Sequence, residues 1–490
     1  MIDKSRYLAG LQCERRLWLQ LFQPKSASDP DGGAESRRAE GIEVGRRAQG
    51  LYPGGVAVES SDWSAALGET ARLLRDPSVP AIFEAAFERD GLRIRADILE
   101  RRPAGGWALC EVKSATRVRG EHIDDVAFQL FVLEANGIAA RPAHVVHVDG
   151  DFVRGNDGID WTRFFRRTDV TARAVDRTPD VGVDVARLRS VREQSAAPQI
   201  EPSEQCRRPR WCEFWDHCTR DRPADWIGRF PGLTGARLVW LQQQGVERIA
   251  DIPADFPLNA IQVRVREALA GGGEITAPEL VHALEKLGPP SLYLDFETYG
   301  PAVPPYPGTR PFQQLLFQWS LHAAAGDDSL GHREFLATGR EDPRRAFAES
   351  LLEALAETDH PVFVYSRFES DRLAELARDL PDLADEIGAV RARLQDLYAI
   401  VRHHVYHPEF RGSFSLKRVA PALAPCFGYD DLQDVADGGA AVGALERLVS
   451  GTLEPDAEAR LRCSLLAYCE RDTLALVELH RALRTRAGLS

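Results

Sequence analysis

A Glu-x-Lys tripeptide could help to hold a divalent cation. Glu111 and Lys113 lie two residues apart in GWALCEVKSA, and alternate residues of a β-strand project from one face. Asp97 lies in the preceding alternating segment and can meet them across a short turn. Two carboxylates and an ammonium suit metal-assisted phosphodiester hydrolysis, because the carboxylates bind a hard cation and the lysine orients water or stabilises negative charge. A surface ion pair on a hairpin is the alternative interpretation.

A second acidic pair, Asp295 and Glu297, interrupts the apolar segment SLYLDFETY. On one face of a strand the two carboxylates would repel each other and lose hydration unless cations neutralise them. In YCERDTLAL, Tyr468 and Asp472 are four residues apart and therefore share one face of a helix. These residue types indicate a second metal site.

Four of the eight cysteines form a one-plus-three pattern. Cys206, Cys212 and Cys218 are each separated by five residues in CRRPRWCEFWDHC, and Cys13 lies near the N-terminus. Four thiolates could bind zinc or an iron–sulfur cluster. Metal binding here would close a very long loop, so that its binding energy would become folding energy.

The elements that must position these residues follow from hydrophobic periodicity. Strands are predicted over 91–102 and 106–115, a helix over 120–137 and a hairpin over 141–155. From residue 289 onward, three strand-like segments precede helix 343–357, the strand PVFVYS and a run of helices. We therefore expect an α/β fold with RNase H-like layers in the C-terminal part.

The length of 490 residues predicts about three domains. We place them at 1–222, 223–288 and 289–490. Glycines around residues 232–245 of the small helical middle domain favour a helix–turn–helix pair of the helix-hairpin-helix kind, which grips DNA backbones in some proteins and is a plain linker in others.

Composition excludes several classes. The formal charge is −13 and 44% of the residues are hydrophobic, with no apolar run of about 18 residues, so no membrane span or membrane partner is expected. The charged start MIDKSRYLAGLQCERRLW lacks the apolar core of a signal peptide, which favours a cytoplasmic protein. In that compartment the cysteines favour metal binding over disulfides. The acidic total argues against a simple basic nucleic-acid binder, although local patches can still contact phosphates.

The first motif resembles the RecB-type branch of the PD-(D/E)XK nucleases. In that branch a distant Asp, an E-x-K motif and a helix bearing Gln form the active site, which here implies Asp97, Glu111, Lys113 and Gln129. Members often have a metal-binding His on an early helix. The matching region, 39–55, has none at that place. Glu40 or Glu43 could supply a ligand instead, although a solvated helix face is the favoured interpretation for either.

The cysteine pattern, flanking this motif, resembles the iron–sulfur RecB-type nucleases. The resemblance implies a [4Fe–4S] cluster on Cys13, Cys206, Cys212 and Cys218 that ties the ends of the nuclease domain together and supports DNA binding. The family often has C-x2-C-x5-C where this chain has C-x5-C-x5-C, so zinc is kept as the alternative.

The C-terminal motifs resemble the DnaQ-like 3′–5′ exonucleases of the DEDD superfamily in their tyrosine form. That family has D-x-E in its first motif and Y-x3-D in its third, as here. Its second motif, N-x3-F-D, has an altered counterpart in YSRFESDRL, where Ser366 replaces Asn and Glu369 replaces Asp. Asp371 is a possible substitute for Glu369.

This resemblance implies catalysis with two Mg²⁺ or Mn²⁺ ions. Asp295 would bridge both ions, while Glu297, Glu369 and Asp472 would complete their shells and Tyr468 would orient the nucleophilic water.

Together the motifs resemble an uncharacterised bacterial family that fuses the two nuclease types. We expect a metal-dependent DNA nuclease with two active sites that acts on single-stranded DNA or DNA ends in repair or defence, and a helicase is a possible partner. Two alternatives stay open. One is an RNA-directed 3′–5′ exonuclease, and the other is a nucleic-acid-binding or redox-sensing scaffold with one inactive nuclease domain.

Overall fold

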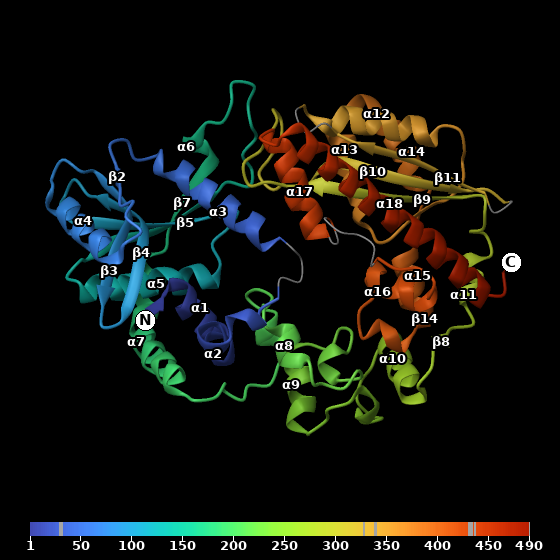
Figure 1. The fold of residues 1–490 in the computed structure, drawn as a ribbon, viewed down its shortest axis with the longest axis horizontal. Helices are drawn as coiled ribbons and strands as arrows, with labels where there is room; N and C mark the ends of the chain where they lie inside the picture. Colours follow the sequence, from blue (N-terminus) through green and yellow to red (C-terminus); the bar gives the residue numbers. More distant parts are fainter. Residues whose placement is uncertain (29–32, 327–328, 338–340, 430–434, 436–437, 490) are drawn as a thin grey trace. The chain divides into compact units, whose positions relative to one another are not determined.

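The protein is mixed α/β and consists of two compact units (Figure 1). The computed structural model describes residues 1–28, 33–326, 329–337, 341–429, 435 and 438–489. The first unit contains the described residues up to Arg220, apart from Gly33, together with Gly300–Gln313. The second contains Gly33, Asp221–Tyr299 and the described residues from Gln314 onward.

The helical segment that we expect as a middle domain belongs to the second unit. Its strand β8 (Ile275–Thr276) pairs antiparallel with β14 (Val405–Tyr406). The backbone at Gly412 also packs so closely that an added Cβ would lie 1.8 Å from the carbonyl oxygen of Arg229. These contacts join residues 221–288 to the C-terminal part, whereas the sequence suggests a boundary at 288.

The first unit is built on one sheet with the strand order β2-β3-β4-β5-β6-β7, and β1 pairs with β4. Neighbouring strands run antiparallel except for the parallel pairs β1–β4, β2–β3 and β5–β6. The strands are β1 (Ile2–Asp3), β2 (Val56–Ala57), β3 (Ala81–Arg89), β4 (Leu92–Arg101), β5 (Trp107–Lys113), β6 (Ala140–Val148) and β7 (Phe165–Asp169).

Helices cover both faces of this sheet. Leu109 on β5 and Phe128 on α5 share one core, and Cys110 packs in the other core with Val44 on α3. Because side chains alternate along β5, its odd-numbered residues, including Glu111 and Lys113, face α5. The helices are α1 (Lys4–Gln12), α2 (Glu14–Phe22), α3 (Ala34–Gln49), α4 (Trp63–Arg75), α5 (Gly120–Ala135), α6 (Trp161–Phe164), α7 (Thr171–Glu193) and α8 (Trp215–Thr219).

Most of the predicted elements of this unit are present. The strands predicted over 91–102 and 106–115 are confirmed as β4 and β5, and the helix over 120–137 is confirmed as α5. The hairpin predicted over 141–155 is wrong, because the antiparallel partner of β6 is β7, which follows α6. The two strands that form this ladder are thus separated by a helix that local periodicity did not indicate.

The second unit has a five-stranded sheet with the order β11-β10-β9-β12-β13. The pairs β11–β10 and β10–β9 are antiparallel, while β9–β12 and β12–β13 are parallel. The strand expected at SLYLDFETY and the later PVFVYS strand are confirmed as β9 and β12, and the segments FQQLLFQWSLH and REFLA contribute to β10 and β11. The strands are β9 (Ser291–Tyr299), β10 (Leu315–Ala324), β11 (Leu330–Leu336), β12 (Val362–Val364) and β13 (Leu394–Asp396).

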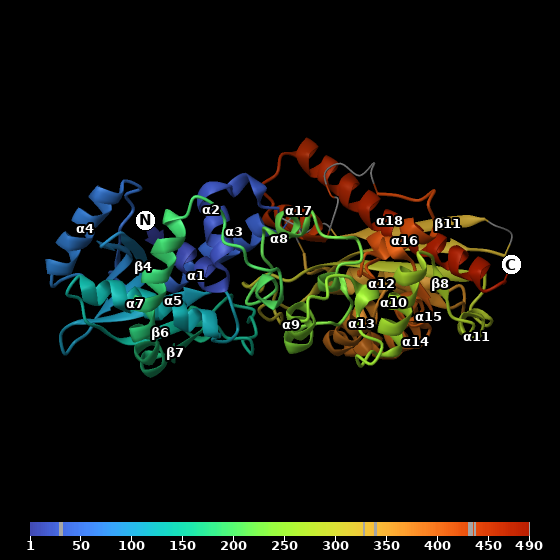
Figure 2. The same cartoon turned by 90° about the horizontal axis from the view of Figure 1, so that it is seen from below.

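The two faces of this second sheet are covered by different helices (Figure 2). Leu292, Leu294 and Phe296 of β9 pack in a core with residues of α12 (Pro343–Leu355), α13 (Phe368–Asp379) and α14 (Ala384–Ala392). Residues of α17 (Gly438–Ser450) and α18 (Pro455–Arg486) pack with Phe317 of β10 in a separate core. The odd-numbered residues of β9 therefore face α18.

The remaining helices of this unit include only part of the expected helix–turn–helix pair. α9 (Gly235–Gln243) forms, but the stretch after Gly245 makes only the 3₁₀ turn Ile249–Asp251 before α10 (Ala260–Gly271). In the described part of the chain, no helix combines the length and apolar character needed to cross a bilayer. The remaining helices are α9 (Gly235–Gln243), α10 (Ala260–Gly271), α11 (Leu280–Leu284), α15 (Leu397–His404) and α16 (Leu416–Leu423).

Candidate metal-binding sites

The first acidic site lies where two strands of the first unit separate. The ladder between β4 and β5 ends at the pair Ile98–Cys110. The next residues along the two strands are Asp97 and Glu111, and the N–H of Val112 donates to Oδ2 of Asp97 at 2.8 Å. A side-chain carboxylate therefore accepts a hydrogen bond where the ladder would continue, which fixes Asp97 beside Glu111.

All four predicted side chains of this site come together. Lys113 Nζ donates to Glu111 Oε1 at 2.7 Å, and Gln129 Nε2 on α5 donates to Glu111 Oε2 at 2.7 Å. Lys4 lies at the start of α1, and its Nζ donates to Asp97 Oδ1 at 3.2 Å and to Glu111 Oε1 at 3.0 Å. The side chain of Glu111 lies at the centre and is 2% exposed.

Lys4 and Asp125 are two members that sequence reasoning missed. Asp125 on α5 accepts from Lys113 Nζ at 2.5 Å and from Gln129 Nε2 at 3.0 Å. Burial opposes the charge of both lysines, but the facing carboxylates outweigh it and hold the pKa of Lys4 and of Lys113 above the usual range. Two ammonium groups thus face three carboxylates, and lysines already neutralise most of this site.

Two neighbouring glutamates differ in their relation to the site. Glu84 on β3 is half-buried, and burial together with repulsion from Asp97 raises its pKa to about 7, although Lys4 opposes this. Glu40 Oε1 accepts a hydrogen bond at 2.7 Å from Oγ of Ser114, which is the residue immediately after Lys113. The other alternative ligand on α3, Glu43, instead forms ion pairs with the arginines that follow it on the same helix.

The four predicted cysteine ligands are free thiols of the first unit. Cys13 separates α1 from α2, Cys206 ends a 3₁₀ turn, and Cys218 lies on α8. The N–H of Cys212 donates to the carbonyl oxygen of Cys206 at 2.8 Å. Burial, with a further contribution from Cys13 and Cys218, raises the pKa of Cys206 to about 11. Burial, with contributions from Glu213 and Cys206, raises that of Cys212 to about 12.

Polar contacts already fasten the N-terminal helices to the cysteine-rich segment. Gln12 Nε2 donates to the carbonyl oxygens of Gln205 and Arg210, both at 2.8 Å. Arg16 also forms an ion pair with Glu213 at 2.9 Å. The side chains next to Cys13 therefore hold it near residues 206–218, as the predicted four-thiol site requires.

The second acidic site lies between β9 and α18. Asp295 and Glu297 project from the face of β9 opposite to Leu294 and Phe296, which are in the core. Asp472 projects from α18 toward the same face. One carboxylate oxygen from each of these three acids lies within 4.8 Å of the other two. Two acids that are two residues apart on a strand thus meet a third acid from a helix more than 170 residues later in the chain.

The altered second motif also contributes a buried acid. Glu369 lies in the first turn of α13 and is 3% exposed, and burial raises its pKa to about 8, with a contribution from Asp396. Ser366 has φ 125° and its Oγ accepts from the N–H of Phe368 at 3.1 Å, so it shapes the turn into this helix. Asp371, the possible substitute, is exposed.

Glu369 and Asp472 are buried and Asp295 and Glu297 are half-buried, and the charge of Lys417 opposes the raised pKa of Glu297 and of Asp472. Burial, followed by repulsion from Asp472, Glu297 and Glu369, raises the pKa of Asp295 well above its usual value. Burial and Asp472 raise that of Glu297 to about 8, which Lys417 on α16 opposes. Among the described residues, Oε2 of Glu369 and Oδ1 of Asp472 are buried without a hydrogen-bond partner. A divalent cation would relieve both the repulsion and the missing contacts.

Aromatic side chains border the same acids. Tyr468 lies one turn before Asp472 on α18, and burial together with Asp472 raises the pKa of Tyr468 and of Tyr429 above the usual range. Lys417 Nζ lies 4.6 Å from the ring centroid of Tyr468 and 5.5 Å from that of Tyr429. Sequence reasoning did not identify Tyr429 as part of this site.

Weak sequence signals were available for some of the missed residues. The chain has only five lysines, and Lys4 shares that rarity with Lys113. Cys469, whose Sγ lies 3.5 Å from Oδ2 of Asp295, sits beside Tyr468 in the third motif. Asp125 lies one helical turn before Gln129 and thus shares its helix face.

The family model described as domain of unknown function (DUF2779) matches residues 292–415. This match includes Asp295, Glu297 and Glu369 but ends before Tyr468 and Asp472. No curated protein and no solved structure matches the chain.

Proposed function

We propose that the protein is a metal-dependent nuclease with two active sites that hydrolyse phosphodiester bonds in DNA. The observation that carries the proposal is the convergence of Asp295, Glu297 and Asp472, whose carboxylate oxygens lie within 4.8 Å of one another. These buried and half-buried acids repel one another, and among the described lysines Lys417 is the one that opposes their charge, so the group is unfavourable without a cation. Divalent cations bound by carboxylates are the usual means of cleaving phosphodiesters at neutral pH.

The second unit supports the narrower proposal of an RNase H-like, DEDDy-type 3′–5′ exonuclease. Strand β9 carries the D-x-E pair, and α18 carries the Y-x3-D pair, as the resemblance implies. Glu369 supplies the fourth acid from a longer side chain than the aspartate of that family. In this scheme the four acids hold Mg²⁺ or Mn²⁺ and Tyr468 orients the attacking water, while the cations stabilise the attacking and leaving oxygens.

The first unit supports a PD-(D/E)XK site of the RecB type. Asp97, Glu111, Lys113 and Gln129 come from β4, β5 and α5 in the order that the resemblance implies. Their donors fit a single hard cation, because two carboxylates converge with a lysine close to them. Lys4 lies between the same carboxylates, so a cation bound by both would compete with its ammonium group.

The cysteine residues fit a metal group through four free thiols near one another. The resemblance to the iron–sulfur RecB-type nucleases favours a [4Fe–4S] cluster, and zinc held by the same four thiolates is the alternative. A brown preparation that contains iron, and that loses both colour and iron in Cys212→Ser, would support this assignment, whereas a colourless one with zinc would contradict it.

The substrate in this proposal is single-stranded DNA or a DNA end, which a helicase could supply. The decisive experiment follows cleavage of 3′- and 5′-labelled single- and double-stranded DNA with Mg²⁺ or Mn²⁺. Asp295→Asn is expected to lower removal of 3′ nucleotides at least 100-fold. Glu111→Gln is expected to remove a separate set of products, and the double variant is expected to be inactive.

Two comparisons make the experiment specific. Asp385→Asn, on the exposed face of α14, is the matched control and keeps both activities. An RNA of the same sequence tests the choice of sugar. If neither Asp295→Asn nor Glu111→Gln changes any product, the two-site proposal is wrong.

A further inference from the structure

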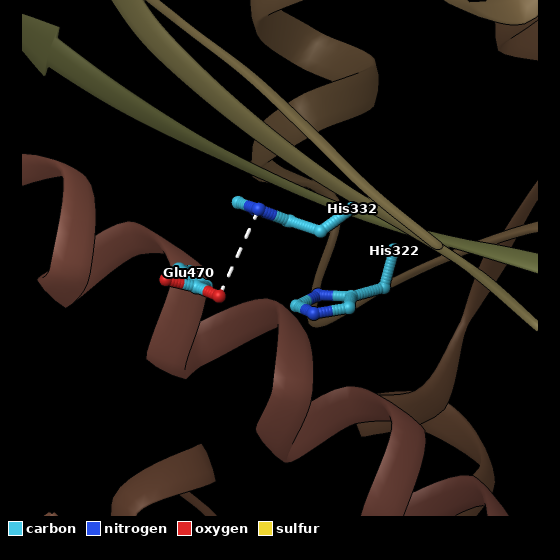
Figure 3. Close-up of side chains that lie close together, drawn as sticks. All are labelled: His322, His332 and Glu470. Atoms are coloured by element: carbon cyan, nitrogen blue, oxygen red, sulfur yellow. Dashed lines mark ion pairs between the residues drawn. The ribbon is translucent and has the colours of Figure 1, made fainter. Parts of the chain in front are cut away.

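Two histidines face each other on the hairpin of β10 and β11 in the second unit. His322 and His332 are directly opposite in the antiparallel register, and their ring centroids are 4.6 Å apart. Glu470 on α18 approaches them, with Oε1 3.7 Å from His332 Nδ1. One ligand atom from each residue lies within 4.8 Å of the other two. Figure 3 shows the three side chains converging from the hairpin and the helix.

Two hydroxyl groups orient the imidazole rings. His322 Nδ1 lies 2.8 Å from Thr473 Oγ1, and His332 Nε2 lies 2.9 Å from Ser320 Oγ. The hydroxyls of Ser320 and Thr473 are themselves 2.8 Å apart. Histidines that bind metals almost always form a hydrogen bond through the second ring nitrogen, which fixes the tautomer. Here those bonds use one nitrogen of each ring and make the other, Nε2 of His322 and Nδ1 of His332, available to a metal.

The cluster combines a buried inner part with an accessible outer part. His322 is 4% exposed, whereas the side chain of Glu470 is 49% exposed. Glu334 lies two residues after His332 on β11 and therefore on the same face of the strand. Solvent thus reaches the cluster from the carboxylate side, and a further carboxylate lies near the entrance.

We propose that His322, His332 and Glu470 form a binding site for a transition-metal dication such as Zn²⁺. Imidazole nitrogens are borderline donors, and two of them together with a carboxylate suit zinc and its neighbours better than Mg²⁺. Bonds of about 2.0–2.2 Å in a tetrahedral site place ligand atoms about 3.4 Å apart. The His332–Glu470 separation of 3.7 Å is close to that value. Three protein ligands leave a coordination position for water or a further ligand.

This site is chemically distinct from the acidic site on the same sheet. Ser320, which holds His332, is the register partner of Asp295 on β9, and α18 carries both Glu470 and Asp472. The acidic site offers only carboxylate oxygens, whereas the histidine site offers two nitrogens. A metal at the histidine site would tie the β10–β11 hairpin to α18. Its binding does not depend on the proposed nuclease activity.

The test measures Co²⁺ bound to the full-length protein after removal of metals by a chelator. Equilibrium dialysis with excess Mg²⁺ present, followed by elemental analysis, gives the number of Co²⁺ ions per chain and the Kd. His332→Gln and Glu470→Gln are each expected to lose one Co²⁺ per chain relative to the wild type. Thr473→Val keeps the ligands but removes a hydroxyl that orients His322, so it should weaken that binding about 10–100-fold.

His282→Gln is the matched control. His282 Nδ1 lies 3.8 Å from Glu285 Oε2 in an exposed pair, which is not part of a three-ligand group among the described residues, so this variant should bind Co²⁺ like the wild type. Circular dichroism verifies the fold of each variant, and Glu470→Gln alters only a half-exposed side chain. The proposal is overturned if His332→Gln and Glu470→Gln both retain the wild-type number and affinity of Co²⁺ ions. It is equally overturned if Asp295→Asn, and not Glu470→Gln, loses the ion.

Discussion

Replacing Glu297 by glutamine should stabilise the metal-free protein. In the folded state, burial and repulsion from Asp472 raise the pKa of Glu297 from 4.5 to about 8. The folded protein therefore binds this proton more tightly than the unfolded chain does. The stabilisation that the protonated carboxyl gives to the folded state is fully present below pH 4.5, and it is lost as the pH rises through about 8. Glutamine cannot ionise, so the variant avoids that loss.

The magnitude follows from the same pKa. A rise from 4.5 to about 8 corresponds to about 4–5 kcal/mol when the group is fully ionised in the folded state. Water reaches part of this half-buried carboxyl, and the neighbouring acids share the repulsion. We therefore expect the free energy of unfolding of Glu297→Gln, relative to that of the wild type, to increase by about 2 kcal/mol as the pH rises from 5 to 8.

Urea unfolding in a chelating buffer at pH 5, 6, 7 and 8 measures this difference. Glu386→Gln on the exposed face of α14 is the control and should follow the wild type at every pH. Mn²⁺ at about 100 times its Kd should add about 2.7 kcal/mol to the wild type and much less to Glu297→Gln. A variant that is no more stable than the wild type at pH 8 without metal would refute the reasoning.

Three further predictions concern other parts of the molecule. Lys4→Met removes the ammonium group that contacts both Asp97 and Glu111 and should cost about 3 kcal/mol at pH 7, although Lys113 still pairs with Glu111. Mg²⁺ should raise the melting temperature of this variant more than that of the wild type, and equal responses would contradict this. Burial lowers the pKa of His480 to about 4, so protonation of this histidine should cost the wild type about 2 kcal/mol as the pH falls from 7 to 5. In urea unfolding, the stability of the wild type relative to His480→Gln should fall by about that amount over this pH range, and an unchanged difference would contradict this. Gly412→Ala places a Cβ 1.8 Å from the carbonyl oxygen of Arg229 at φ +80° and should cost about 3 kcal/mol or more, whereas Gly443→Ala, with open space around it in a helix, should not destabilise the protein.

Local periodicity was sufficient to predict the elements that carry the acidic residues. Alternation in SLYLDFETY predicted β9 and placed Asp295 and Glu297 on one face, because side chains of a strand alternate whatever its partners are. The four-residue spacing of Tyr468 and Asp472 predicted one face of a helix for the same kind of reason. The hairpin predicted over 141–155 failed because strand pairing is not a local property, and β6 pairs with a strand beyond α6.

The balance of charge at each site could not be read from spacing. Lys4 is 93 residues from Asp97 and 107 residues from Glu111 in the chain, yet its ammonium group contacts both. Lysine neutralises most of the first site, while the second places several carboxyls near one lysine. Only the packing of distant segments decides how many charges a buried site contains, and hence how strongly it needs a metal.

By itself, the sequence determined which residue types occupy one face of each strand and helix, because those periods are set by backbone geometry. The tertiary structure decided which faces meet. It brought β9 together with α18, and it paired His322 with His332 opposite Glu470, a combination without any sequence motif. Such clusters depend on strand register and helix packing, which many weak contacts over the whole unit determine together.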